Sequence, residues 1–325
     1  MPATESITAE NIAPGVSVVI PAHNESEGIA NSIRTIQKIL ADLKTAYEII
    51  VVDDGSADDT FCRVQQMAAE DRVLKGIQLS RNFGKESAIL AGLEAARGDV
   101  VITIDADLQH PPALIPEMLE LWRSGYKVVH AVKGDRSTDS RIARWRAHLF
   151  NGLMTRLGGI DVRNSSDFKL LDRVVVNAMV NDLPERRRFY RGLADWVGFR
   201  QTSVPFAVAE RESGQGKWSF IALADLAMTA IVSFTSAPLR IVTFLGLLTL
   251  VLGLIIATDA LWSWSHGRAI SGFATMIITL LIIGSFIMIS LGIIGEYIAK
   301  MYEEIKRRPV YIVSSKCGFE ADKHP

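Results

Sequence analysis

The segment Val16-Ser17-Val18-Val19-Ile20-Pro21-Ala22 is almost continuously apolar, and the run from Tyr47 to Val52 repeats this pattern. Similar apolar runs follow at 76–79, 100–104 and 127–132. Runs of this kind are typical of strands in a parallel sheet that helices cover on both faces. The stretches between them have apolar residues at three-to-four spacing. The pattern therefore predicts an α/β fold with a mostly parallel, doubly wound, Rossmann-like sheet.

Polar segments follow the first four runs, at residues 21–25, 53–56, 80–85 and 105–110. In a parallel sheet these segments lie beyond the same edge, where ligands bind. Helix capping explains single polar residues there, but not paired aspartates after two different strands. Like charges in one crevice repel each other unless a cation or hydrogen-bond donors offset them. We therefore expect one functional cleft at this edge.

Asp105 and Asp107 stand two residues apart just after the fourth run. If the extended geometry continues past the strand, both side chains point to the same side. Carboxylates favour a hard divalent ion, Mg²⁺ or Mn²⁺, which leaves coordination positions for substrate phosphates. Such an ion can neutralise the charge that develops on a leaving diphosphate.

Other nucleotide-binding patterns are missing from the sequence. It has no Gly-x-x-x-x-Gly-Lys phosphate loop, and no Gly-x-Gly-x-x-Gly fingerprint follows the first run. This argues against an ordinary nucleoside triphosphatase or a dinucleotide-dependent dehydrogenase. The formal net charge of the 325 residues is -1, so the composition gives no reason to expect nucleic acid as a partner. Two cysteines, Cys62 and Cys317, are too few for a disulfide framework.

Two long runs without charged residues, Ile241–Thr258 and Phe273–Gly295, lie near the end of the sequence. Each is long enough to cross a hydrocarbon core of about 30 Å as a helix. We therefore expect two transmembrane helices within 239–298, joined by a loop from Asp259 to Gly272. Basic residues flank the pair on its outer sides, with Arg240 before it and Arg308 after it.

Positively charged flanks stay in the cytoplasm. We therefore expect a multi-pass protein of the inner or plasma membrane, with both termini and the catalytic part on the cytoplasmic side. Residues 1–15 are expected to form a flexible tail, and 299–325 a cytoplasmic tail with a strand at Pro309–Val313 that returns to the soluble part. Residues 218–238 have the pattern of an amphipathic helix at the membrane surface, with core packing as the alternative.

The polar segments also resemble a known family. Pro21-Ala22-His23-Asn24-Glu25, Asp53-Asp54-Gly55-Ser56 and Asp105-Ala106-Asp107-Leu108-Gln109 are similar to segments of family 2 inverting glycosyltransferases with the GT-A fold. From about Val16 to the tail, the chain resembles the polyprenyl-phosphate sugar transferases, namely dolichol-phosphate mannose synthases and bactoprenol glucosyltransferases. The bactoprenol branch is matched by Arg81–Glu86, Asp135–Asp139, Pro184–Arg186, Trp196–Gly198, Gly295–Ile298 and Arg308-Pro309.

This resemblance implies that a GT-A domain at 16–217 transfers a sugar from a nucleotide sugar to a polyprenyl phosphate, such as undecaprenyl phosphate. UDP-glucose is the first candidate donor, and GDP-mannose or a UDP-linked amino sugar stays open. A homotetramer is also plausible by resemblance.

The resemblance further assigns roles to individual residues. The nucleoside site would be Pro21, Ala22, Asn24, Glu25 and Asp53. Asp105 and Asp107 would flank the metal, and Gln109 would approach the sugar phosphate. Among the basic residues, Arg211 and Lys217 are the candidates for the donor diphosphate, and Arg136 for the acceptor phosphate.

Asp167 corresponds to the family's candidate general base. A lipid phosphate has a second pKa near 6 by analogy with phosphorylated side chains, so it needs little deprotonation. Asp167 can instead position the acceptor or stabilise the sugar ring. A structural carboxylate paired with Lys169 or Arg173 is the alternative. The chain departs from the family at Ser166 and Gly216, where glycine and a hydroxyl residue are frequent, and both departures bear on donor details.

Three competing functions are less consistent with the sequence. A processive polysaccharide synthase would carry a Gln-x-x-Arg-Trp-like element and more membrane spans. A lipid-sugar flippase or transporter would have polar residues at mid-membrane among many helices. A non-catalytic sensor of nucleotide sugars would not need Asp105, Asp107 and Asp167 together.

Overall fold

A computed structural model describes residues 15–133, 165–183, 185–186, 188–206, 237–266 and 272–319 of the chain. The described residues form two compact units. Of the described residues, the first unit contains those at 15–133, 165–206 and 309–319, and the second contains 237–266 and 272–308. Most of the expected tail (1–15) and of the expected surface helix (218–238) lies outside the described part, as do Arg136, Arg211 and Lys217. The last two residues of the expected surface helix, 237 and 238, belong instead to the long helix that follows.

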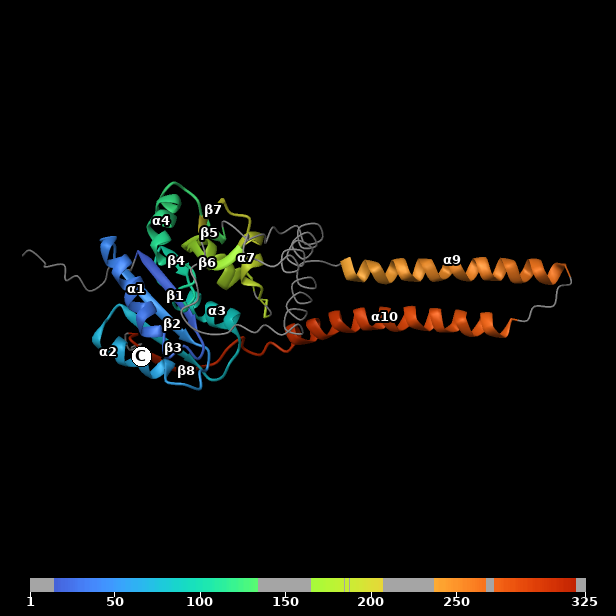
Figure 1. The fold of residues 1–325 in the computed structure, drawn as a ribbon, viewed down its shortest axis with the longest axis horizontal. Coiled ribbons are helices and arrows are strands. Elements are labelled where there is room, and N and C mark those ends of the chain that lie inside the picture. The colour runs from blue at the N-terminus through green and yellow to red at the C-terminus, as the bar shows by residue number, and fades with distance from the viewer. Residues whose placement is uncertain are drawn as a thin grey trace, which may run out of the picture. The chain divides into compact units, whose positions relative to one another are not determined.

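An eight-stranded sheet forms the centre of the first unit, in the order β7-β5-β6-β4-β1-β2-β3-β8 (Figure 1). Its strands are β1 (Val16–Ala22), β2 (Tyr47–Asp53), β3 (Leu74–Leu79), β4 (Val100–Thr103), β5 (Val128–Lys133), β6 (Ser165–Asp172), β7 (Gln201–Phe206) and β8 (Val313–Cys317). Strands β1 to β4 are parallel to one another, and β5 is parallel to β7. β6 is antiparallel to β4 and β5, and β8 is antiparallel to β3. The predicted mostly parallel α/β fold is confirmed.

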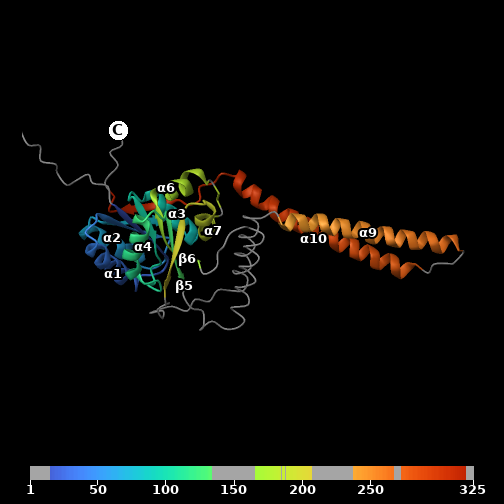
Figure 2. The same cartoon turned by 90° about the horizontal axis from the view of Figure 1, so that it is seen from above.

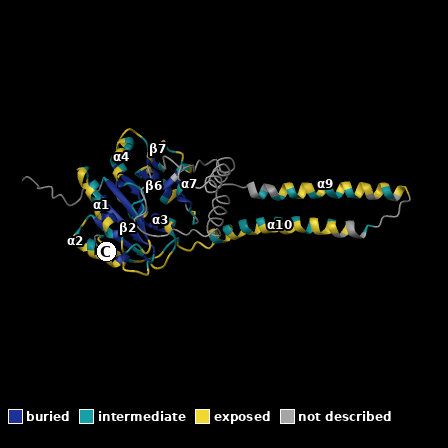
Figure 3. Ribbon diagram, viewed as in Figure 1, coloured by how far each residue is buried: buried dark blue, intermediate teal, exposed yellow. Residues whose placement is uncertain are grey.

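Helices pack on both faces of this sheet. They are α1 (Ile29–Asp42), α2 (Thr60–Glu70), α3 (Lys85–Ala95), α4 (Ile115–Arg123), α6 (Arg173–Asn177) and α7 (Tyr190–Trp196), with short turns at Pro112–Leu114 and Ala178–Asp182. The apolar stripe of α1, which includes Ile33 and Ile36, is fully buried and belongs to one core cluster with Val18 and Ile20 of β1. β1 is buried along its whole length, as the continuous apolar run predicts (Figure 3).

The second unit consists of two long apolar helices, α9 (Ala237–Ser265) and α10 (Phe273–Ile305), which lie side by side as a hairpin (Figure 2). The segments Val242–Ser263 and Ile278–Ile305 are long and apolar enough to cross a membrane. Both helices extend beyond the expected limits. Asp259 lies inside α9 rather than in a loop, and residues 299–305 continue α10 rather than starting a tail. Helical hydrogen bonds are local, so charged residues past the apolar run can prolong a helix.

The expectation for the strand near the C-terminus was wrong in its bounds. This strand is Val313–Cys317 rather than Pro309–Val313, and it forms one edge of the sheet, where it pairs with β3 through Gly76 and Cys317. The sequence analysis did not predict β6. This strand carries Asp167 and Lys169 among its buried residues, so its sequence lacks the apolar pattern of the other strands.

The turn after β2 requires a glycine. Gly55 has a φ of +62°, and a Cβ atom there would overlap the backbone of Arg81 in the loop after β3. We predict that Gly55→Ala lowers the free energy of unfolding by roughly 1–3 kcal/mol, because it adds backbone strain and displaces that loop. The melting temperature of the purified protein measures the effect. Gly28→Ala is the control, since nothing lies within 4 Å of a Cβ at Gly28. Equal melting temperatures for the two variants would contradict the prediction.

Candidate active site

A cavity of about 350 Å³ lies at the carboxyl ends of β1, β2, β3 and β4. All four predicted polar segments contribute to its wall, which includes Pro21, Glu25, Asp54, Lys85 and Asp105. This is the edge at which ligands bind in sheets of this kind. The location of the cleft therefore follows from the order of strands and polar segments in the sequence.

Hydrogen bonds between loops fix the rim of the cavity. The ring of His23 lies 2.9 Å from the carbonyl oxygen of Asp54 through Nδ1 and 3.1 Å from the side-chain amide of Asn82 through Nε2. The carboxylate of Asp54 accepts from the backbone N–H groups of Phe83 (2.7 Å) and Gly84 (2.9 Å). Asp54 therefore anchors the loop that leads into α3, and its carboxylate serves the protein backbone.

The residues predicted to bind the nucleoside differ in their position relative to the cavity. Pro21, Ala22 and Glu25 line the cavity. Asp53 is fully buried, and its carboxylate accepts from Ser56 and from the side chain of Gln78. Asn24 is exposed at the rim, with a φ of 55°, and its side-chain oxygen accepts from the backbone of Ala57. A role for Asp53 in binding the nucleoside thus stays a prediction.

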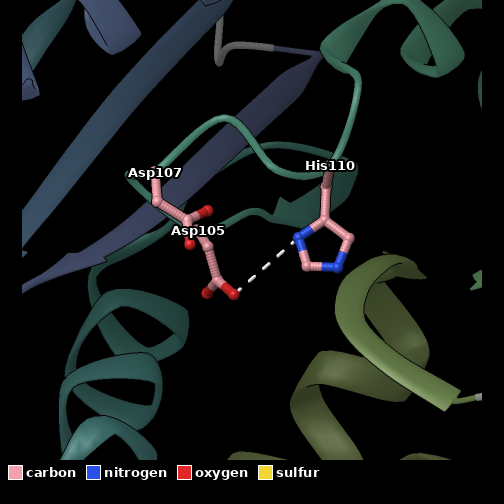
Figure 4. Close-up of side chains that lie close together, drawn as sticks. All are labelled: Asp105, Asp107 and His110. Atoms are coloured by element: carbon pink, nitrogen blue, oxygen red, sulfur yellow. Dashed lines mark ion pairs between the residues drawn. The ribbon is translucent and has the colours of Figure 1, made fainter. Parts of the chain in front are cut away.

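Asp105, Asp107 and His110 form a compact group at one side of the cavity (Figure 4). One potential ligand atom from each lies within 4.8 Å of the other two. β4 ends at Thr103, so the condition that strand geometry continues to Asp105 and Asp107 is not met. Instead a turn with Leu108 at a φ of 53° brings the residues together, and Gln109 donates its backbone N–H to Asp107.

His110 was not among the predicted metal ligands. Its Nδ1 atom is buried, makes no hydrogen bond within the described part of the chain, and lies 3.8 Å from a carboxylate oxygen of Asp105. Its ring packs edge-on against Phe206. Burial lowers the pKa of His110, so the imidazole stays neutral and keeps a lone pair for a cation. Two carboxylates and one neutral imidazole therefore fit a divalent ion of the Mg²⁺ or Mn²⁺ class.

Asp167 on β6 joins this group through Lys85. The pairing of antiparallel β4 and β6 ends at Thr103↔Lys169, and Asp105 and Asp167 each lie two residues beyond that pair. The Nζ atom of Lys85 lies 2.6 Å from a carboxylate oxygen of each aspartate. Carboxylates this close to each other repel, and Lys85 offsets the repulsion.

Arg191 of α7 provides the second counter-charge of Asp167. Its Nε and Nη2 atoms donate to the two carboxylate oxygens, at 2.7 and 3.0 Å. Of the two alternative partners expected from the sequence, Arg173 is not a partner of Asp167, whereas a pair with Lys169 stays a prediction. Lys169 lies 2.9 Å from the ring of His130, and Arg173 donates to the carbonyl oxygen of Gly98.

These two cations determine the charge of Asp167. Burial alone would raise the pKa of its carboxyl, but Lys85 and Arg191 outweigh this effect and hold that pKa well below its ordinary range. Asp167 is therefore a carboxylate at any physiological pH and a weak proton acceptor. The geometry favours a role in positioning and electrostatics over one in proton abstraction.

Sequence reasoning missed Lys85 and His110 as site residues and did not single out Arg191. Lys85 and His110 belong to the polar segments after β3 and β4, so their positions could have suggested them. Arg191 comes from a helix well separated from these segments in the sequence, and only the folded contacts identify it. Gln109 contributes a backbone contact to the turn, and its predicted role toward the sugar phosphate is not tested.

Glu86 provides a test of the charges in this region. Burial and the negative charge of Asp167 raise its pKa to about 7 from 4.5, and its carboxylate accepts from the backbone N–H of Tyr190. A raised carboxyl pKa means that the folded state binds the proton more tightly, so stability falls as pH rises from 4.5 to 7. We predict that Glu86→Gln is more stabilising at pH 8 than at pH 5, by about 1–3 kcal/mol. The melting temperatures of Glu86→Gln and the wild type at the two pH values measure the effect. The same difference between variant and wild type at pH 5 and at pH 8 would contradict the prediction.

Comparison with known proteins agrees with this geometry. The family model described as glycosyl transferase family 2 matches residues 17–184, and that of the GtrB C-terminal hairpin matches residues 237–301. An uncharacterized glycosyltransferase of Synechocystis is 41% identical over 94% of this chain and 96% of its own.

Two further relatives carry more specific names. A prophage bactoprenol glucosyl transferase homolog of Escherichia coli is 37% identical over 92% of this chain and 98% of its own. The bactoprenol glucosyl transferase of Shigella phage SfII is 36% identical over 92% of this chain and 97% of its own. The chain is a glycosyltransferase and belongs to glycosyl transferase family 2.

Proposed function

We propose that this enzyme transfers glucose from UDP-glucose to a polyprenyl phosphate, with inversion at the sugar carbon, at the cytoplasmic face of a membrane. Relatives named bactoprenol glucosyl transferases, 36–37% identical over 92% of the chain, support the reaction class. One observation carries the assignment to this cavity. The carboxylate expected at the metal, Asp105, and the carboxylate expected at the acceptor, Asp167, lie on either side of the same ammonium group.

The donor side of the site is the cavity lined by Pro21, Ala22 and Glu25. Asp105 and Asp107 would hold a divalent ion, with His110 as a further ligand. When bound, that ion supplies positive charge that offsets the charge developing on the leaving diphosphate. Lys85 lines the same cavity and adds a second positive charge. Arg211 and Lys217 are proposed to close over the diphosphate.

The acceptor side is built on Asp167. Its carboxylate holds Arg191 by two hydrogen bonds that use two of the three guanidinium nitrogens. The third nitrogen can donate to a phosphate, which guanidinium groups bind well. Arg136 is proposed as a further ligand of the acceptor phosphate. Because a lipid phosphate arrives largely ionised, Asp167 needs only to orient these cations and to face the developing positive charge on the sugar.

The helices α9 and α10 support the proposal that the acceptor is a lipid. Both contain segments long and apolar enough to cross a bilayer, where a polyprenyl phosphate resides. The basic residues Lys306, Arg307 and Arg308 directly after α10 favour the cytoplasmic side for this end of the helix. We further propose that residues 218–236 form a helix at the membrane surface, and that the protein assembles as a homotetramer.

Product analysis tests the proposed reaction. The purified full-length protein is incubated with undecaprenyl phosphate and, separately, with UDP-glucose, a UDP-linked amino sugar and GDP-mannose, and the lipid fraction is analysed by mass spectrometry. We expect a hexosyl phospholipid with UDP-glucose. A product with another donor alone would change the sugar but keep the reaction. Release of nucleotide without a lipid product under all conditions would contradict the proposal.

The metal assignment predicts the behaviour of Asp107→Asn. Loss of this ligand should lower turnover by about 10²–10³-fold, since the charge stabilisation by a bound metal is worth several kcal/mol. The fold should persist, as shown by an unchanged melting temperature. Asp59→Asn is the control, because Asp59 is exposed and makes no side-chain capping bond at α2. Full wild-type activity in excess chelator would contradict the assignment.

Asp167→Asn separates positioning from proton abstraction. Because Lys85 and Arg191 keep the pKa of Asp167 low, we expect a loss of turnover that persists from pH 6.5 to pH 8.5. A general base contributes about 10²–10⁴-fold, so its loss would be visible as recovery at high pH, where the lipid phosphate ionises unaided. The pH profile of turnover at saturating donor makes the distinction. Marked recovery toward wild-type turnover by pH 8.5 would restore the general-base role.

A further inference from the structure

Lys85 occupies an unusual position for a lysine. It is the first residue of α3, directly after Gly84, and its ammonium group lies between Asp105 and Asp167 at 2.6 Å from each. Its side chain is 41% exposed, whereas those of Asp105 and Asp167 are 21% and 10% exposed. A long side chain with this exposure can change partners without any movement of the backbone.

The two aspartates depend on Lys85 to different degrees. Asp167 keeps both hydrogen bonds from Arg191 if Lys85 leaves. For Asp105, the described residues offer Lys85 at 2.6 Å and the imidazole of His110 at 3.8 Å. The ammonium group of Lys85 is the nearer of the two by more than 1 Å, so Lys85 is the main counter-charge of Asp105 within the described part of the chain. Only Asp105 therefore needs a replacement cation when Lys85 moves.

A divalent ion at Asp105, Asp107 and His110 would compete with Lys85. Both cations would share the carboxylate of Asp105, and like charges that close to each other repel. The cavity that Lys85 lines is also the proposed place of the donor diphosphate, whose oxygens offer the ammonium group a new anionic partner. The metal can thus replace Lys85 as the partner of Asp105, while the diphosphate replaces Asp105 as the partner of Lys85.

We propose that Lys85 is a built-in cation of the resting site, which neutralises Asp105 until the metal and the nucleotide bind together and then transfers to the diphosphate. This inference rests on the proposed function, because it assumes a metal at Asp105 and a nucleotide in the cavity. Its consequence is thermodynamic coupling. Metal alone binds weakly, since it must displace Lys85, and bound nucleotide removes part of that cost.

The test compares Mn²⁺ binding with and without UDP in the full-length protein. Electron paramagnetic resonance measures free Mn²⁺ in titrations of the wild type, Lys85→Met and Lys85→Gln, with protein-free blanks that correct for Mn²⁺ bound to UDP. In the wild type, UDP should strengthen Mn²⁺ binding. Without UDP, either substitution should strengthen Mn²⁺ binding by about tenfold or more, the worth of a charge-assisted contact. With UDP this gain should be much smaller, so UDP should strengthen Mn²⁺ binding less in the two variants than in the wild type.

Two controls make the comparison specific. Lys127 is 42% exposed and lies 2.8 Å from Asp172, so it matches Lys85 in exposure and in pairing with a carboxylate. Lys127→Met should leave both Mn²⁺ affinities unchanged. Lys85→Arg keeps the charge and should keep the wild-type ratio of the two affinities.

The possible failures are distinguishable. If Lys85→Met and Lys85→Gln bind Mn²⁺ more tightly by the same factor with and without UDP, Lys85 acts as a fixed charge and the exchange is wrong. An Mn²⁺ affinity that neither substitution changes also overturns it. Absence of Mn²⁺ binding to the wild type, with or without UDP, overturns the metal site of the proposed function itself.

Discussion

Parallel pairing of β1 with both β2 and β4 is the constraint on which the site depends. It makes these strands, and β3 beside them, end at one edge of the sheet, so their polar loops meet there. Apolar strands and the buried stripe of α1 supply the stability of this arrangement. The loops are then free to carry charges that a compact core would not tolerate.

The antiparallel strand β6 adds the element that distinguishes this site from a simple nucleotide cleft. Its pairing with β4 ends at Thr103↔Lys169, and just beyond this pair Asp167 shares Lys85 with Asp105. Two carboxylates that close to each other require a cation. Lys85 at the start of α3 and Arg191 of α7 meet this requirement. The donor and acceptor sides are therefore coupled by charge, because a change at either carboxylate alters the partners of Lys85.

The local parts of this arrangement could be predicted from the sequence, and the non-local parts could not. Apolar runs and helical spacing identify β1, β2 and α1, and strand order places the polar segments at one edge. β6 escaped prediction because Asp167 and Lys169 interrupt its apolar pattern, and only their buried partners make them compatible with a strand. Lys85 lies 82 residues before Asp167, so no local signal connects the two. Helix ends beyond an apolar run, as in α10, are equally hard to predict.

The central claim is that the nucleotide and its metal bind in the cavity at the strand ends, beside Asp167. The most direct measurement is an anomalous difference map from crystals of the full-length protein grown with Mn²⁺ and UDP. We predict one peak within about 2–2.5 Å of carboxylate oxygens of Asp105 and Asp107, a distance typical of oxygen ligands to divalent ions. The diphosphate of UDP should adjoin that peak. A peak away from both aspartates, or UDP bound outside the cavity, would contradict the account.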